Sequence, residues 1–340
     1  MDIKSGMSNI YFFEIEKEHE NYFRQSLPDN DLIFFEEKLT VENAWQAKEA
    51  DILSVFIYSS VDKQVIQKMP NLRFISTRST GFEHIDLQAA RQRGIEVANV
   101  PAYGENTVAE HTIALILSLF HNIHKAYVRS TEGKFDYRGL MGRDLKEKTL
   151  GIIGGGKIGM HVARIAKALG LDVQVYDLKH RHFLAEVLDF RYVSLDKLLR
   201  TSDIISLHMP LNKNTVHFID WNKIQKMKRG AVIINTARGG LVDSAALIRG
   251  LDEGIIGGAG LDVLEGEGMI TEEVQIALST KSMENLRTLV ESNILLHREN
   301  VIITPHIAYY SAEAMKRIAE VTVENIRTFL EGKPENIIAA

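Results

Sequence analysis

The sequence predicts an α/β protein with two doubly wound parallel-sheet domains. Its 340 residues exceed the usual length of one compact domain. Short apolar runs alternate with helix-like stretches through the first hundred residues, and a second series of the same kind begins near Thr149. Strands that alternate with helices in this way form parallel sheets that carry helices on both faces.

The first series contains five expected strands. The stretches between them, such as "TVENAWQAKEAD", have apolar residues at helical spacing. After the fifth strand, a long helix is expected from about Glu105 through "TVAEHTIALILSLFHNIHKAY". This helix is apolar over much of its surface, as a buried or interface helix would be. The expected strands lie at 10–15, 32–35, 52–57, 72–77 and 95–99.

The second series contains the strands "TLGIIG", "DVQVYD", "DIISLHM", "AVIINTA" and "IGGAGLDV". Region 266–299 then breaks the alternation, because "SMENLRTLVESNILLHREN" has a helical pattern where a short connection is usual. We therefore expect an insertion there. A strand at 301–304 and a helix at 312–330 follow, and Gly332 and Pro334 mark the end of that helix.

The composition argues against several classes of protein. A net charge of -5, spread along the chain, gives no basic face for nucleic acid. The absence of cysteine excludes disulfides, thiolate metal sites and a cysteine nucleophile. The apolar run 113–120 is too short to span a bilayer, and the first residues do not have the pattern of a signal peptide. We therefore expect a cytoplasmic protein with no nucleic-acid or membrane partner.

A glycine pattern, Gly154-x-Gly156-x-x-Gly159, lies between an expected strand and an expected helix. This strand–turn–helix context is the one in which the pattern binds a dinucleotide. The first glycine allows a tight turn, the second lets the backbone approach a pyrophosphate, and the third permits close packing of the helix on the strand. The helix N-terminus adds unpaired N–H groups and a partial positive charge for the phosphates.

Asp177 ends the next strand, about 20 residues past the last glycine. Its carboxylate can accept hydrogen bonds from both hydroxyls of the adenine ribose, and it would repel a 2′-phosphate. The predicted cofactor is therefore NAD. Because Lys179 and Arg181 follow closely, some use of NADP stays open.

Three polar residues follow strands of the second series, namely Arg238, Glu267 and His306. The carboxyl ends of parallel strands meet at one edge of a sheet, so these side chains can converge beside the cofactor. A histidine can exchange a proton with an alkoxide, and an arginine can bind a carboxylate and polarise a keto oxygen. A carboxylate at Glu267 would hold the imidazole in one orientation. The set predicts hydride transfer at a 2-hydroxy or 2-keto carbon.

Each of the three residues, taken singly, is more often structural or solvated than catalytic, so the prediction depends on their joint placement beside a nucleotide site. The remaining histidines are expected to be structural, and they include His111, His121, His124 and His208.

The motifs together resemble the D-isomer-specific 2-hydroxyacid dehydrogenase family over almost the whole chain. The matching pieces are "GGGKIG", "SLHMPLNKNT", "NTARGGLVDSAAL", "GAGLDVLEGE" and "TPHIAYYS". The D-lactate dehydrogenase branch is the most similar, because of "TRSTGFEHIDL", "NVPAYGENTVAEHT", the insertion after Glu267 and the aromatic residues after His306.

The resemblance implies that a Rossmann NAD-binding domain, residues 102–308, is inserted into a flavodoxin-like substrate domain, residues 1–101 plus 309–340. The NAD-binding domain would include the 268–299 insertion and the helix after Pro101, which would form the interface of a homodimer. Arg238 would bind the substrate, His306 would be the acid/base, and Glu267 would support it.

The resemblance also implies further binding residues. Backbone N–H groups of Thr80 and Gly81 would bind the substrate carboxylate, and Tyr103 and Tyr309 would line the pocket. The NAD-binding positions would be Gly154, Gly156, Lys157, Ile158, Gly159, Asp177, Met209, Pro210, Thr215, Thr236, Ala237 and Asp262.

The predicted activity is the NAD-dependent, reversible reduction of a 2-keto acid to a D-2-hydroxy acid, with pyruvate and D-lactate as the expected pair. Phenylpyruvate, 2-ketoisocaproate, glyoxylate and hydroxypyruvate are alternative substrates. An NAD-sensing binding protein that uses the same fold without catalysis is the alternative from another class, since a fold alone does not fix a function.

Overall fold

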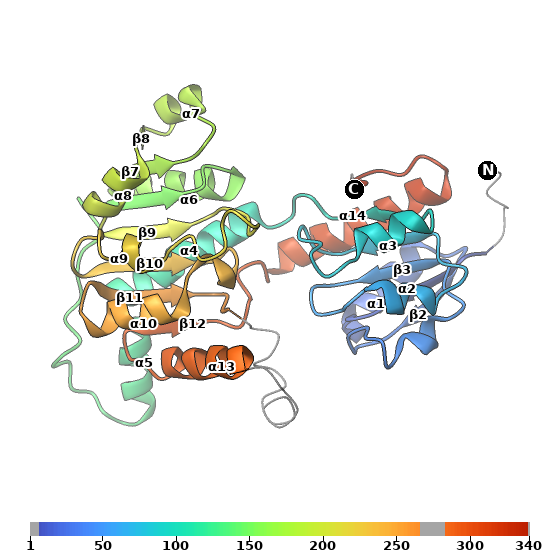
Figure 1. Cartoon of the computed structure of the whole chain (residues 1–340), viewed down its shortest axis with the longest axis horizontal. Coiled ribbons are helices and arrows are strands. Elements are labelled where there is room, and N and C mark those ends of the chain that lie inside the picture. The colour runs from blue at the N-terminus through green and yellow to red at the C-terminus, as the bar shows by residue number, and fades with distance from the viewer. Residues whose placement is uncertain (1–6, 266–282, 339–340) are drawn as a thin grey trace. The chain divides into compact units, whose positions relative to one another are not determined.

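The computed structural model describes residues 7–265 and 283–338, and the chain divides into two compact units (Figure 1). Unit 1 contains Met1–Tyr103 and Ser311–Ala340, and unit 2 contains Gly104–Tyr310. The chain therefore passes from one unit to the other twice, after Tyr103 and after Tyr310. Among the described helices, none combines the length and the apolar character needed to cross a bilayer.

Unit 1 is built on a five-stranded parallel sheet with the strand order β2-β1-β3-β4-β5. The last helix of the chain packs on this sheet, where Phe329 stacks on Phe74 with ring centroids 4.3 Å apart. This contact explains why the unit needs both ends of the chain. Its elements are β1 (Asn9–Phe12), α1 (Lys17–Ser26), β2 (Asp31–Phe34), η1 (Ala44–Ala47), β3 (Ile52–Val55), α2 (Lys63–Gln67), β4 (Phe74–Thr77), α3 (Leu87–Gln92), β5 (Glu96–Ala98) and α14 (Ala312–Leu330).

Unit 2 is built on a seven-stranded sheet with the order β12-β11-β10-β9-β6-β7-β8, and every strand pair in it is parallel. From β6 the strands β7 and β8 are added on one side, and β9 to β12 are added on the other, so the strand order reverses at β6. Ligands of such folds bind at the carboxyl ends of the strands beside that point. Its elements are α4 (Glu105–Phe120), α5 (Ile123–Thr131), β6 (Thr149–Ile153), α6 (Lys157–Ala168), β7 (Asp172–Tyr176), α7 (His182–Val187), β8 (Arg191–Tyr192), α8 (Leu195–Thr201), β9 (Ile204–Leu207), α9 (Trp221–Ile224), β10 (Ala231–Asn235), η2 (Gly239–Leu241), α10 (Ser244–Asp252), β11 (Ile256–Leu261), α13 (Met283–Leu296) and β12 (Val301–Ile303).

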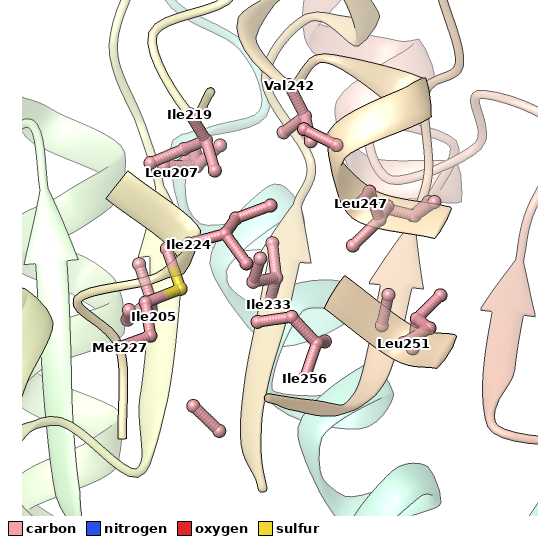
Figure 2. Packing of buried hydrophobic residues seen from close by; sticks show 14 of the residues in the cluster. Ile205, Leu207, Ile219, Ile224, Met227, Ile233, Val242, Leu247, Leu251 and Ile256 are labelled. Atoms are coloured by element: carbon pink, nitrogen blue, oxygen red, sulfur yellow. The ribbon is translucent and has the colours of Figure 1, made fainter. Parts of the chain in front are cut away.

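Both faces of the seven-stranded sheet are buried, which explains why its strands read as continuous apolar runs rather than as alternating ones. In β10, Ile233 faces the cluster formed with α9 and α10, and the next residue, Ile234, faces the cluster formed with α4 and α6. Figure 2 shows part of the first cluster, where Ile224 and Leu247 pack over the strands. The strands whose ends carry the site are thus held in place by close packing on both of their faces.

The predicted fold class, two parallel-sheet α/β domains, is confirmed. The long helix expected from Glu105 is two helices, because Asn122 between them has φ 53, a left-handed conformation that ends α4. The short edge strand β8 was not predicted, since two residues, Arg191 and Tyr192, give no periodicity to detect. The helical part of the expected insertion is α13, which contacts α10 and β12.

Candidate active site

The glycine-rich turn connects β6 to α6, and its three glycines serve different needs. Gly154 has φ 103, and a Cβ placed there would lie 2.4 Å from the His208 carbonyl oxygen. A Cβ on Gly159 would lie 2.2 Å from the Gly154 oxygen. Gly156, the N-cap of α6, would have nothing within 4 Å of its Cβ. The first and third glycines are therefore required by packing, and the second leaves open space at a helix N-terminus.

Asp177 follows β7 and is held against this turn. Its Oδ2 accepts a hydrogen bond from Gly155 N at 2.6 Å, and its Oδ1 accepts one from Lys179 N at 2.8 Å. The carboxylate is thus fixed beside the glycine turn, as a group that selects between ribose hydroxyls and a ribose phosphate must be. Lys157, by contrast, has an exposed side chain whose Nζ lies 3.3 Å from Glu105 Oε1.

The segment after β9 forms the other side of the turn. The Thr215 hydroxyl donates to the Pro210 oxygen at 2.8 Å and accepts from Asn212 N at 2.7 Å, which closes the 210–215 loop directly after Met209. His208 Nε2 lies 2.8 Å from the hydroxyl of the fully buried Ser206. Burial lowers the pKa of His208 to about 3, so this imidazole is neutral at neutral pH.

Arg238 lies in the loop after β10, which packs closely on the chain beyond β11. Asn235 Nδ2 donates to the Arg238 oxygen at 2.9 Å, and Thr236 Oγ1 lies 2.9 Å from Thr112 Oγ1 of α4. A Cβ on Gly239 would lie 2.1 Å from the Leu264 carbonyl carbon. The guanidinium donates from Nη1 to the Ala237 oxygen at 2.7 Å, and the residue is half-buried at the sheet edge.

His306 follows β12, and its loop is held by Asp262 at the end of β11. The Asp262 carboxylate is 1% exposed, and it accepts from Ile307 N at 2.9 Å and from Ala308 N at 2.8 Å. The main-chain oxygen of Asp262 accepts from His306 N at 2.9 Å. His306 itself has φ 54, which non-glycine residues rarely adopt. Several bonds from one residue thus fix the backbone on which the imidazole is carried.

Glu267 lies outside the described residues, so its predicted support of His306 stays a prediction. Glu265, two residues before it, accepts from the Ser244 hydroxyl at 3.1 Å and lies 2.5 Å from His217 Nε2. This hydrogen bond with Glu265 raises the pKa of His217. The contacts of Glu265 connect the chain beyond β11 to the start of α10 and to the segment between β9 and α9, a role that the sequence did not indicate.

The described part of unit 1 contains Thr80, Gly81 and Tyr103. The Thr80 hydroxyl donates to the Val100 oxygen at 2.8 Å, and Asn99 Nδ2 donates to the Thr80 oxygen at 2.8 Å. Within the described residues, the backbone N–H groups of Thr80 and Gly81 have no acceptor in the protein. Two adjacent free N–H groups in a fixed loop are what a carboxylate needs. The Tyr103 oxygen accepts from Arg317 Nε at 2.6 Å.

Within unit 2, the structure brings the candidate residues to one edge of the seven-stranded sheet. The glycine turn, Asp177, the 236–238 loop, Asp262 and His306 follow β6, β7, β10, β11 and β12, which are all parallel. The Tyr309 ring meets the His306 ring edge-on, with centroids 6.2 Å apart. This edge combines an open helix N-terminus with a fixed imidazole and a guanidinium, which suits a nucleotide and an anionic substrate.

Comparison with known proteins agrees with this geometry. Residues 113–308 match the family model described as "D-isomer specific 2-hydroxyacid dehydrogenase, NAD binding domain". A structure of the pyruvate reductase of Chlamydomonas reinhardtii superposes with a TM-score of 0.87 and 34% identity, over 98% of this chain and 99% of the other.

Two further relatives are similar over most of their length. The D-lactate dehydrogenase of Aquifex aeolicus, solved with NAD and lactic acid, superposes with a TM-score of 0.85 and 37% identity, over 98% of this chain and 99% of the other. The glyoxylate reductase of Korarchaeum cryptofilum is 36% identical over 298 residues, which are 86% of this chain and 84% of the relative.

Proposed function

The chain belongs to the D-isomer-specific 2-hydroxyacid dehydrogenase family, and from this membership we propose that it reduces pyruvate to D-lactate, with His306 as the acid/base. The family makes it an NAD-dependent oxidoreductase. The observation that carries the proposed role is the His306 loop, whose backbone is fixed by Asp262 at the same edge of the sheet as the glycine turn.

The residues of unit 2 fit the cofactor. The open space at Gly156 admits a pyrophosphate at the N-terminus of α6, and the fixed Asp177 carboxylate suits ribose hydroxyls. When NAD is bound, its nicotinamide supplies the redox chemistry. The other cofactor positions inferred from the resemblance, Asp262 included, remain proposals. Asp262 already uses both carboxylate oxygens within the protein.

The proposed roles of the chain's own groups follow from the charge that develops on the substrate. During reduction the keto oxygen becomes an alkoxide, and His306 donates a proton to it; during oxidation the imidazole takes that proton back. Arg238 binds the substrate carboxylate and polarises the keto oxygen. The backbone N–H groups of Thr80 and Gly81, which have no acceptor among the described residues, are proposed as further donors for a substrate carboxylate. Unit 1 would then be the substrate domain.

Replacement of the proposed catalytic residues tests the mechanism. We expect His306→Ala and Arg238→Ala to lower kcat/KM for the 2-keto acid by at least about a hundredfold while NADH still binds. The control is His121→Ala, which removes an exposed imidazole at the C-terminus of α4. Full activity in the His306 variant would overturn its assignment as the acid/base.

A panel of 2-keto acids tests the substrate. Relatives named for pyruvate, lactate and glyoxylate are similar to comparable degrees, so glyoxylate is the main alternative, and phenylpyruvate, 2-ketoisocaproate and hydroxypyruvate complete the panel. We expect the highest kcat/KM for pyruvate with NADH. A higher value for another 2-keto acid would overturn the substrate assignment and leave the mechanism in place.

We also propose that the protein is a homodimer. The buried residues of α4, such as Ile113 and Leu115, already pack within unit 2, whereas the chain that follows carries exposed apolar side chains. Tyr127 is 70% exposed, Tyr137 82% and Met141 89%. Light scattering should give twice the chain mass, and Tyr137→Asp should lower it; a monomeric parent protein would contradict the proposal. A cytoplasmic location stays a prediction from composition.

A further inference from the structure

His111 connects helix α4 to the end of the strand that precedes His306. Its side chain is 21% exposed, and its Nε2 lies 3.1 Å from Thr304 Oγ1 and 3.5 Å from Asp262 Oδ1. Across the described residues, it is the one basic side chain within ion-pair distance of the buried Asp262 carboxylate. A histidine in an apolar helix is usually structural, but this one contacts the two groups on which the His306 loop depends.

The available hydrogen-bond donors determine how His111, Thr304 and Asp262 are connected. The Thr304 hydroxyl has one proton, and it donates that proton to Asp262 Oδ1 at 2.5 Å. A carboxylate can only accept, so the Thr304 oxygen must accept from His111. His111 therefore carries a proton on Nε2. The resulting chain runs from the His111 N–H to the Thr304 hydroxyl and on to the Asp262 carboxylate.

We propose that His111 is a positioning residue for the proton-transfer group His306. The Asp262 carboxylate that His111 and Thr304 orient also accepts from the two backbone N–H groups directly after His306. His306 needs this support, because its φ of 54 lies in the left-handed region. A carboxylate free to rotate would hold those N–H groups less firmly, and the imidazole would lose its fixed place.

The hydrogen bond between His111 and Thr304 also joins the two segments at which the chain crosses between the units. Helix α4 begins at Glu105, directly after the chain leaves unit 1, and the His306 loop ends at Tyr310, directly before the chain returns. Within unit 2 these two segments touch, since a Cβ on Gly104 would lie 3.7 Å from Tyr309 Cβ. His111 thus connects the helix of the first crossing to the loop of the second.

Four variants and one control test the inference, which rests on the proposed role of His306. His111→Leu removes the donor, His111→Gln offers an N–H near the same place, Thr304→Val removes the relay hydroxyl, and the fourth variant combines His111→Leu with Thr304→Val. His121→Leu makes the same substitution at the exposed end of α4. For each protein, kcat and KM for the 2-keto acid, the Kd for NADH and the melting temperature are measured.

We expect His111→Leu and Thr304→Val each to lower kcat about tenfold, as a misplaced catalytic group does, with the Kd for NADH unchanged. His111→Gln should recover most of the lost kcat. The double variant should be no slower than the slower single variant, because both substitutions break one chain of hydrogen bonds. The His121→Leu control should keep the kcat of the parent protein.

The inference would be overturned by an unchanged kcat in Thr304→Val, by an equal loss in His111→Gln and His111→Leu, or by losses that multiply in the double variant. Thr304→Val does not change α4, so its kcat tests the inference even if His111→Leu does not fold. If His306→Ala keeps full activity, the proposed function fails; if His306→Ala is inactive while Thr304→Val is not impaired, only the present inference fails.

Discussion

Gly156→Ala separates the cofactor role of the glycine turn from its packing role. The backbone at Gly156 has φ -72 and ψ -169, which alanine adopts freely, and the added methyl group would have no protein atom within 4 Å. A compatible Gly→Ala change stabilises a fold by about 0.4–1 kcal/mol through the unfolded state. The melting temperature should therefore stay constant or rise by about 1–4 °C.

Although the stability of Gly156→Ala should not fall, its affinity for NADH should. The methyl group would occupy the space through which a pyrophosphate reaches the N–H groups of α6, and overpacking of one methyl group costs about 1–3 kcal/mol. At 1.4 kcal/mol per factor of ten, the Kd for NADH should rise about tenfold to a hundredfold. Fluorescence titration with NADH measures this change directly.

Gly154→Ala provides the matched comparison. The substitution is the same, but φ is 103 and the new Cβ would lie 2.4 Å from the His208 oxygen. We expect a loss of at least about 3 kcal/mol in the free energy of unfolding, hence a melting temperature lower by about 6–12 °C. Unchanged NADH affinity in Gly156→Ala would refute the placement of the cofactor, and a large loss of stability in it would refute the open space.

Three further predictions concern charge. Asp177→Ser should raise kcat/KM with NADPH at least about tenfold relative to NADH, because the carboxylate that repels a 2′-phosphate is gone; an unchanged ratio would count against its role. The pKa of His208 is lowered to about 3, so stability is complete above about pH 6.5 and falls as the pH drops toward 3, by at most about 2 kcal/mol at pH 5; His208→Asn should lose less melting temperature between pH 7.5 and 5 than the parent protein. Glu265 raises the pKa of His217, so the stabilisation that this pair contributes to the fold is present below about pH 6.5 and disappears as the pH rises. Glu265→Gln should therefore destabilise the protein more at pH 6 than at pH 9, by less than about 1 kcal/mol because the pair is partly solvated.

The sequence was sufficient for the elements whose signal is local. Parallel strands buried on both faces read as unbroken apolar runs, so β6, β9 and β10 could be placed from the sequence alone. The glycine turn could also be read, because a strand, a turn and a helix follow one another within a few residues. The end of α4 could not be predicted from the sequence, since it depends on the left-handed backbone of Asn122. The Asn122 Nδ2 atom donates to the Met141 oxygen at 3.1 Å, a contact with chain that lies 19 residues away.

The contacts between site residues that are far apart in the sequence could not be predicted for a different reason. His111 and Thr304 are 193 residues apart, and their approach requires the pairing of β11 with β12 and the packing of α4 on both. The sequence identified His306 from its place after a strand, but it gave Asp262 only a cofactor role. The hydrogen bonds of Asp262 to the 306–308 backbone exist only once two parallel strands lie in register.

The buried carboxylate of Asp262 and the left-handed backbone of His306 explain each other. A left-handed residue with a side chain costs about 1–2 kcal/mol, and an unpaired buried carboxylate costs several. Each hydrogen bond to a charged acceptor contributes about 1.5–3 kcal/mol, and Asp262 accepts from the Ile307 and Ala308 N–H groups on different oxygens. An amide could not replace it, because in either orientation its NH₂ group would face one of these donors. Only a carboxylate satisfies both, and the loop that satisfies the carboxylate is the one that fixes His306 at the sheet edge.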